Sequence, residues 1–124
     1  MPPVDGRDAW SRVCHQADLE PERGATALVN GHAVALFRLP SPGGGDDELY
    51  CLGGSDPFAR NGMLARGIVG RRGPVPIVGS PTHRRAFDLR TGRCLDDPSV
   101  HVPVYRVKVV DGVVHVGPRC LPQP

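Results

Sequence analysis

Short apolar runs separated by turn residues set the pattern of the chain. Apolar side chains do not recur at helical spacing over windows of about 11 residues, whereas β-branched runs broken by Gly, Pro, Asn and Asp occur throughout. Residues 25–39 predict two strands, ATALV and HAVALFRL, joined by Asn30-Gly31, a pair that readily adopts the positive φ angles of a type I′ turn. Asp111-Gly112, between VPVYRVKVV and VVHV, predicts a second hairpin.

Shorter strands are predicted between the two hairpins. They fall at residues 49–52, 67–69, 76–78 and 86–89, and each is bounded by turn residues. In the last of them, alternation turns Phe87 and Leu89 inward and Asp88 outward. The tract PSPGGGDDE has the composition of a flexible loop, and no more than one helical turn is indicated. The pattern predicts an all-β sandwich or small barrel with little or no helix.

Composition fits one domain of ordinary globular character. The 124 residues are 40% apolar and 23% charged, which is enough to close a single core. We expect one domain over residues 1–124, with a core over about 10–116 and a flexible tail over 117–124. The net charge of +2 gives no field suited to nucleic acid or a membrane surface, so any partner must be recognised by local patches.

The expected location is the cytoplasm. The first residues, MPPVDGRDAW, lack the basic segment and apolar run of a signal peptide, and no stretch approaches the roughly 20 apolar residues of a membrane span. The chain has four cysteines and no C-x-x-C pair, which disfavours a zinc knuckle or a dithiol. In a reducing compartment these cysteines are expected to be free thiols that pack as small apolar residues.

Two turn-rich loops carry the candidate chemistry. The second reads S-P-T-H-R-R-A-F-D-L-R-T-G from residue 80, and it resembles the downstream cluster-binding loop of Rieske proteins, C-P-x-H-x-x-x-F-D-x-x-x-G. The first reads D-P-F from residue 56 and is similar to the upstream C-P-H segment. The resemblance implies a Rieske-like antiparallel β architecture.

The resemblance also identifies the positions of the lost cluster ligands. A Rieske centre takes two cysteine thiolates on one iron and two histidines on the other. The cysteine positions hold Asp56 and Ser80, one histidine position holds Phe58, and only His83 keeps a ligand type. Iron–sulfur clusters select soft thiolate donors, so we expect no cofactor in this chain. Cys51 lies about 16 Å along an extended strand from residue 56, which is too far to substitute.

The chain as a whole resembles the small subunit of NAD(P)H-dependent nitrite reductase. The likeness rests on W-x-x-V-C at 10–14, ALVNGHAVALFRL at 27–39, D-P-F at 56–58, ARGIVG at 65–70 and FDLRTGRCLDDPSVHVPVYRVKVVDG at 87–112. It implies a large-subunit partner that carries FAD, an iron–sulfur cluster and sirohaem and reduces nitrite to ammonia in nitrate assimilation. This chain has neither a G-x-G-x-x-G fingerprint nor a cysteine set for such groups, so we expect a non-catalytic subunit that binds and stabilises the large one.

Other functions stay open at this point. A Rieske-type electron-transfer ferredoxin of an oxygenase would share the fold, although the ligand count disfavours it. A metal site of His83, His101 and His115 would need residues from separate segments. A triad of Ser80, His83 and Asp88 is disfavoured, because a Ser and a His three apart on a turn rarely meet in nucleophile geometry.

The loop tips are the expected contact with the large subunit. They present Arg60, His83, Arg84 and Arg85, and arginine pairs readily with carboxylates. Phe58 is expected to be largely buried between the loops, where it would replace the packing of the lost cluster. The pair Asp96-Asp97 precedes a proline and predicts a turn rather than a metal site. Arg71 and Arg72 form a second basic spot that is either solvated or used in docking.

Overall fold

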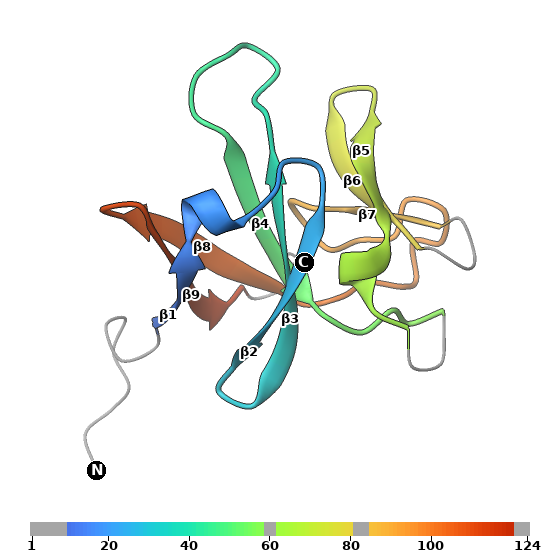
Figure 1. The fold of residues 1–124 in the computed structure, drawn as a ribbon. Coiled ribbons are helices and arrows are strands. Elements are labelled where there is room, and N and C mark those ends of the chain that lie inside the picture. The colour runs from blue at the N-terminus through green and yellow to red at the C-terminus, as the bar shows by residue number, and fades with distance from the viewer. Residues whose placement is uncertain (1–9, 59–61, 81–84, 121–124) are drawn as a thin grey trace.

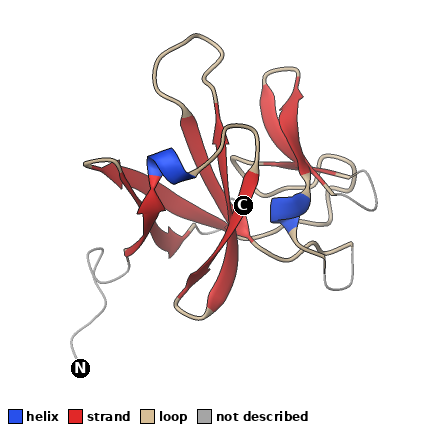
Figure 2. Cartoon of the chain, viewed as in Figure 1, coloured by secondary structure: helices blue, strands red, loops and turns tan. Residues whose placement is uncertain are grey.

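The computed structural model describes residues 10–58, 62–80 and 85–120, and they form strands with two short 3₁₀ turns. The all-β prediction is confirmed, and Figure 2 shows how little of the described chain is helical. The 3₁₀ turns are η1 (Gln16–Asp18) and η2 (Leu64–Arg66). The strands are β1 (Ser11–His15), β2 (Gly24–Val29), β3 (His32–Leu39), β4 (Glu48–Gly53), β5 (Ile68–Arg72), β6 (Val75–Gly79), β7 (Ala86–Asp88), β8 (Val104–Val110) and β9 (Val113–Arg119).

The strands form two antiparallel sheets. Six of them make a curled sheet in the order β1-β9-β8-β4-β3-β2, and β5-β6-β7 make a small sheet to one side of it (Figure 1). Both predicted hairpins are present with the expected turn geometry: Asn30 and Gly31 have φ of 51° and 82°, and Asp111 and Gly112 have 51° and 78°. These left-handed values suit a two-residue turn that follows the strand twist.

The core divides into two clusters because the strands of the large sheet are buried on both faces. In β3, Phe37 faces one cluster and Leu36 faces the other, as the alternation of a strand requires. The first cluster joins the large sheet to the small one: Ala35, Phe37, Leu39, Leu52, Leu64, Val78, Phe87, Leu89, Cys94 and Val102. The second lies inside the curl: Leu19, Val29, Val34, Leu36, Cys51, Val114 and Val116.

The ends of the domain differ from the prediction. β1, whose SRVCH sequence shows no clear alternation, was not predicted and pairs with β9. The expected flexible tail from residue 117 is wrong for its first part, since β9 continues to Arg119. Gly117 lies under the ring of Trp10, where an added Cβ would come within 2.7 Å of the indole. Arg119 pairs with Tyr105 in β8. The end of β9 is therefore held by Trp10 on one side and by β8 on the other.

None of the helical turns in the described part of the chain has the length and apolar character needed to cross a membrane.

Candidate functional site

The two loops that resemble the cluster-binding loops connect β4 to η2 and β6 to β7. The first is closed at its base by a hydrogen bond from Leu64 N–H to the carbonyl of Gly54 (2.9 Å) and another from Asp56 N–H to the carbonyl of Gly62 (3.0 Å). The second is closed where Ser80 N–H donates to the carbonyl of Arg85 (2.8 Å). These backbone bonds place residues 56 and 80 at fixed positions above the first core cluster.

Asp56 and Ser80 contact each other directly. Both are buried, with exposed fractions of 4% and 3%, and the Ser80 hydroxyl donates a hydrogen bond to Oδ2 of Asp56. The other carboxylate oxygen, Oδ1, accepts the N–H of Phe58 at 2.9 Å. The structure therefore brings together the two positions that the resemblance assigns to thiolates on a single iron, and it joins them by a hydrogen bond between their own side chains.

Phe58 packs over the first core cluster but is only half-buried. Its ring centroid lies 5.9 Å from that of Phe87, with the planes tilted by 43°. The guanidinium of Arg85 lies 4.9 Å from the same centroid, which is cation–π distance. Phe58 thus covers the core as predicted, with its side chain partly rather than completely buried and with Arg85 against its ring.

Three of the four residues predicted to contact the large subunit lie outside the described residues. These are Arg60, His83 and Arg84, so their placement at one docking face stays a prediction. Arg85 is described, is partly exposed and contacts the Phe58 ring. It is therefore in the loop region where the sequence placed it.

The described residues do not fit a Rieske cluster. Both oxygens of Asp56 accept protein hydrogen bonds, the Ser80 hydroxyl donates to that carboxylate, and Phe58 has no lone pair. Cys51 points into the second core cluster, on the far side of the sheet from the loops, and its burial raises the pKa of the thiol to about 12. Among residues 10–58, 62–80 and 85–120, no group of three or more His, Cys, Asp or Glu side chains could hold a metal ion.

The four cysteines are free thiols, as expected. His101 and His115 serve separate roles: His101 is exposed and pairs with Arg93 in an isolated bridge, whereas His115 Nδ1 lies 3.1 Å from the carbonyl oxygen of Val113. The third member of that alternative metal site, His83, lies outside the described residues. The structure therefore gives no shared position to His101 and His115.

The acidic pair before Pro98 forms a turn, as predicted. Asp97 accepts the N–H of Ser99 at 3.2 Å, which is the local bond typical of an Asx turn. Asp96 accepts the N–H of Ala86 at 2.7 Å and lies 3.2 Å from Nη1 of Arg72. The hydrogen bond from the Ala86 N–H lowers the pKa of Asp96, and the hydrogen bond from Arg72 lowers it further.

The basic spot at residues 71 and 72 is occupied by internal ion pairs. Arg71 donates to Glu48 at 3.0 Å and to the carbonyl of Pro40 at 2.9 Å, and Arg72 pairs with Asp96. The hydrogen bond from Tyr50 lowers the pKa of Glu48 most, and the hydrogen bond from Arg71 lowers it further. These arginines therefore tie the small sheet to neighbouring loops.

Comparison with known proteins identifies the family. Residues 9–117 match the model of the Rieske-like [2Fe-2S] domain family. The nitrite reductase (NADH) small subunit of Escherichia coli K12 is 32% identical over 107 residues, which cover 86% of this chain and 95% of that protein. The chain belongs to the nitrite reductase small-subunit family.

Solved structures agree with this assignment. An NADH-dependent nitrite reductase small subunit from Mycobacterium tuberculosis is 40% identical, with a TM-score of 0.79 over 90% of this chain and 96% of that one. The ferredoxin of carbazole 1,9a-dioxygenase from Nocardioides aromaticivorans IC177 is 26% identical, with a TM-score of 0.74 over 89% of this chain and 98% of that one. The fold is thus common to small subunits and to a ferredoxin.

A longer protein contains a similar stretch. The nitrite reductase NAD(P)H large subunit of Klebsiella oxytoca is 32% identical over 108 residues, which cover 87% of this chain and 11% of that protein. In that protein the stretch similar to this small subunit is covalently part of a large subunit.

Proposed function

We propose that this small subunit carries no cluster and acts by binding and stabilising the large subunit of a cytoplasmic NAD(P)H-dependent nitrite reductase in nitrate assimilation. In this proposal FAD, the iron–sulfur cluster and sirohaem are on the large subunit, and this chain supplies no catalytic residue. The contact between Asp56 and Ser80 carries the proposal. A buried carboxylate and a hydroxyl that satisfy each other leave neither group available to a soft metal.

The Klebsiella oxytoca relative supports the partnership. There, a stretch similar to this chain belongs to the same polypeptide as the large subunit. Interfaces within one chain resemble those between chains, so a separate small subunit can occupy the corresponding place by non-covalent docking. This reasoning supports assembly as the role of the present chain.

The proposed contact face is the end of the domain that carries both loops, with Arg60, His83, Arg84 and Arg85. In a cluster-bearing relative this end would have to approach a redox partner, and the surface can persist as a docking face after the cluster is lost. The contact of Arg85 with Phe58 fixes one guanidinium at this end. Charge placed in this way mainly sets the encounter rate and the register of docking.

The experiment co-expresses this subunit with its large subunit and compares Arg84→Glu/Arg85→Glu with a control, Arg12→Glu/Arg23→Glu, which reverses two exposed charges elsewhere. We expect the loop variant to lose co-purification and to lower NAD(P)H-dependent nitrite reduction, while the isolated subunit melts close to the parent temperature, as is usual for surface changes. Binding and activity equal to the parent at moderate salt would place the docking face elsewhere.

A second candidate is a Rieske-type ferredoxin, which the fold shared with the carbazole dioxygenase ferredoxin favours. It requires two thiolates and two imidazoles, and the described ligand positions hold Asp56, Phe58 and Ser80. Iron and acid-labile sulfide determination on anaerobically purified protein separates the two functions.

A further inference from the structure

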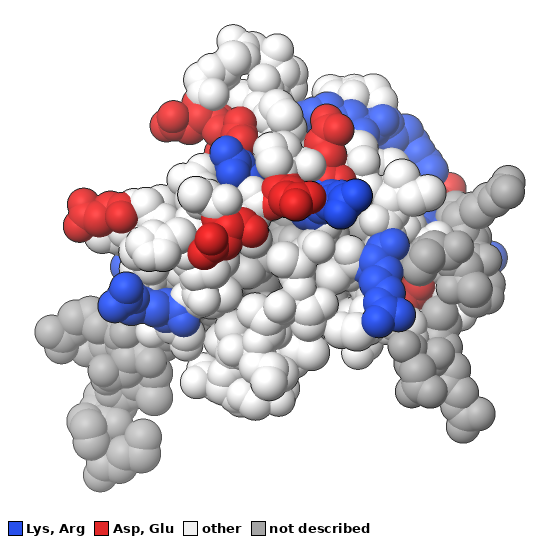
Figure 3. All heavy atoms as spheres, in the orientation of Figure 1, with Lys and Arg blue, Asp and Glu red and all other residues white. Residues whose placement is uncertain are grey.

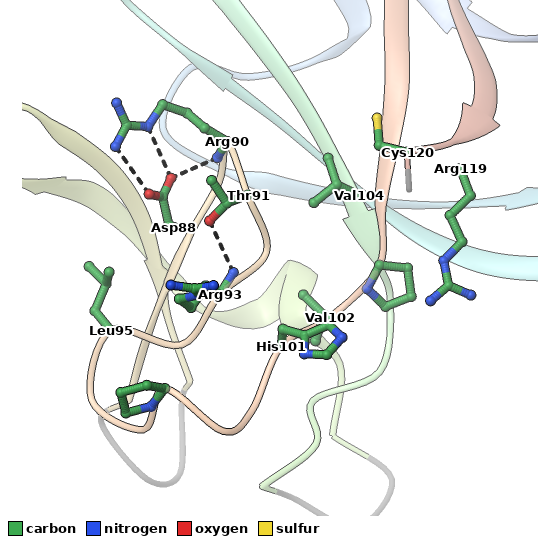
Figure 4. A pocket seen from close by; sticks show the side chains of 12 residues that line it. Asp88, Arg90, Thr91, Arg93, Leu95, His101, Val102, Val104, Arg119 and Cys120 are labelled. Atoms are coloured by element: carbon green, nitrogen blue, oxygen red, sulfur yellow. Dashed lines mark hydrogen bonds and ion pairs between the residues drawn. The ribbon is translucent and has the colours of Figure 1, made fainter. Parts of the chain in front are cut away.

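A cavity of about 660 Å³ lies between the segment that follows β7 and the end of β9 (Figure 4). It is separate from the Asp56–Ser80 contact, since neither residue lines it. Its walls come from the residue 88–104 segment and from Arg119 and Cys120. The sequence did not predict it, because these two segments meet only in the folded chain.

The described lining contains four basic residues and a single carboxylate. The basic residues are Arg90, Arg93, His101 and Arg119, and the carboxylate is Asp88. Asp88 is already satisfied by Arg90: its Oδ1 accepts the backbone N–H (2.8 Å) and Nε (3.1 Å), and its Oδ2 accepts Nη2 (3.1 Å). Figure 4 shows Arg90 turned toward this carboxylate. Asp88 therefore offers little repulsion to an anion in the cavity.

Arg93 and Arg119 have free guanidinium groups. Both are exposed, and within the described residues neither side chain makes a hydrogen bond or an ion pair. His101 lies between them in Figure 4 and pairs with Arg93 across an antiparallel bridge. Each guanidinium presents donors in a planar fork that matches the two oxygens of a carboxylate. The rim is thus suited to a carboxylate-bearing ligand.

The floor of the cavity is apolar and its shape is fixed by the backbone. Val102 is buried, Val104 is half-buried, and Leu95 is 36% exposed at the mouth. Val102 N–H donates to the carbonyl of Gly92 at 2.8 Å, and Cys120 N–H donates to the carbonyl of Val104 at 2.6 Å. A preformed site loses less conformational freedom when it binds.

We propose that this cavity receives an acidic segment of the large subunit, with one carboxylate held by Arg93, another held by Arg119, and an apolar neighbour placed on Val102 and Val104. The inference rests on the proposed function and names a second contact beyond the loop tips. A protein segment fits better than a small ligand, because small-molecule sites enclose most of their ligand around inward polar groups. Here the free charges are at the exposed rim and the floor is apolar.

The test measures the affinity of the purified large subunit for the full small subunit at low and moderate salt. Arg93→Gln/Arg119→Gln should raise the dissociation constant by at least about tenfold and make it depend less on salt. Arg93→Lys/Arg119→Lys keeps the charges but loses the planar forks, so its affinity should be intermediate. The control Arg12→Gln/Arg23→Gln removes the same charge elsewhere and should bind like the parent. Melting temperatures and circular dichroism verify that each variant is folded.

The outcomes separate the two proposals. If the parent small subunit does not bind the large subunit, the proposed function fails and this inference with it. If the parent binds and the Gln variant binds equally well, only the cavity inference is overturned. Calorimetry with citrate gives a further outcome: micromolar binding of citrate that needs Arg93 and Arg119, together with unchanged large-subunit affinity of the Gln variant, would make the cavity a small-anion site and would also overturn the inference.

Discussion

At the scale of single residues, two side-chain contacts hold the loops over the first core cluster. One is the hydrogen bond from Ser80 to Asp56, and the other is the packing of Phe58 against Phe87. Burying a carboxylate is costly unless donors surround it, and Asp56 has the Ser80 hydroxyl and the Phe58 N–H. These contacts connect the two loops through side chains of the protein.

Ser80→Ala should destabilise the protein by about 1–3 kcal/mol, because it leaves a buried carboxylate with one donor fewer. Urea unfolding at pH 7 measures the change. Ser99→Ala is the matched control, since its hydroxyl also donates to an aspartate, Asp97, but in an exposed turn. If Ser80→Ala lowers the free energy of unfolding no more than Ser99→Ala does, the contact of Ser80 with Asp56 contributes little to stability.

Phe58→Ala should lower the free energy of unfolding by about 2 kcal/mol. Emptying a fully buried phenylalanine site costs about 3–5 kcal/mol, and this ring is only half-buried. Leu28→Ala, at a side chain that is 76% exposed, should change the free energy of unfolding by less than about 0.5 kcal/mol. If both substitutions give equally small effects in denaturant melts, Phe58 does not cover the core.

At the scale of elements, the segment from β7 to β8 is held by close backbone approaches rather than by regular secondary structure. Gly92 has a φ of +77°, and an added Cβ would lie 2.1 Å from the carbonyl oxygen of Val102. Asp96 ties the same segment to Ala86 and Arg72. The wall of the basic cavity therefore depends on a few specific positions.

Gly92→Ala should destabilise the protein by more than about 2 kcal/mol, because it adds a steric clash to the strain of a positive φ. Gly73→Ala is the control: Gly73 has a φ of +61° but open space around the added Cβ, so only the smaller conformational cost of about 1 kcal/mol applies. Thermal melting of both variants gives the comparison. Equal losses would mean that Gly92 is not crowded by Val102.

Asp96→Asn should cost about 1 kcal/mol at pH 7 and progressively less at acid pH. The pKa of Asp96 is lowered in the folded state, so its contribution is present above the usual carboxyl pKa of about 3.9 and is lost as the pH falls through the folded value. Urea melts at pH 7, 5 and 3 measure the difference from the parent. The exposed Asp46→Asn serves as the control, and a difference for Asp96→Asn that persists unchanged at pH 3 would contradict this account.

Parts of the fold and site were open to prediction from the sequence for identifiable reasons. The Asn30-Gly31 and Asp111-Gly112 pairs encode their turns locally, so both hairpins were predicted. β1 was missed because its pattern is weak and its partner β9 is far away in sequence. Asp88 was predicted to face outward, yet it is buried against Arg90, an interaction that alternation does not encode.

The sequence predicted where the candidate site lies but not which of its side chains contact each other. The loop motifs located residues 56 and 80, whereas the hydrogen bond between Asp56 and Ser80 depends on how two loops 24 residues apart in sequence meet in space. The degree of Phe58 burial and the basic cavity depend on tertiary packing in the same way. The loop motifs therefore encode where the site lies, whereas its side-chain contacts arise only in the folded chain.

At the scale of the whole molecule, charged side chains gather in patches of either sign, and the net charge is small. On the face shown in Figure 3, basic side chains gather over the upper end of the small sheet, whereas acidic side chains lie mainly over the large sheet. The net charge of the chain is only +2. Under the proposed function, a large subunit would be recognised through local groups such as Arg85, Arg93 and Arg119, and we expect the association rate to fall as salt screens them.

We propose that side chains of the two loops, above all Asp56 and Ser80, take the place of a cluster between them. Iron and acid-labile sulfide determination tests this proposal, with a visible absorption spectrum, on protein purified anaerobically and then incubated with iron and sulfide. We expect a colourless protein without stoichiometric iron or sulfide, because Asp56 and Ser80 bind each other. A visible spectrum with about two irons and two sulfides per chain, the content of a Rieske centre, would contradict the account.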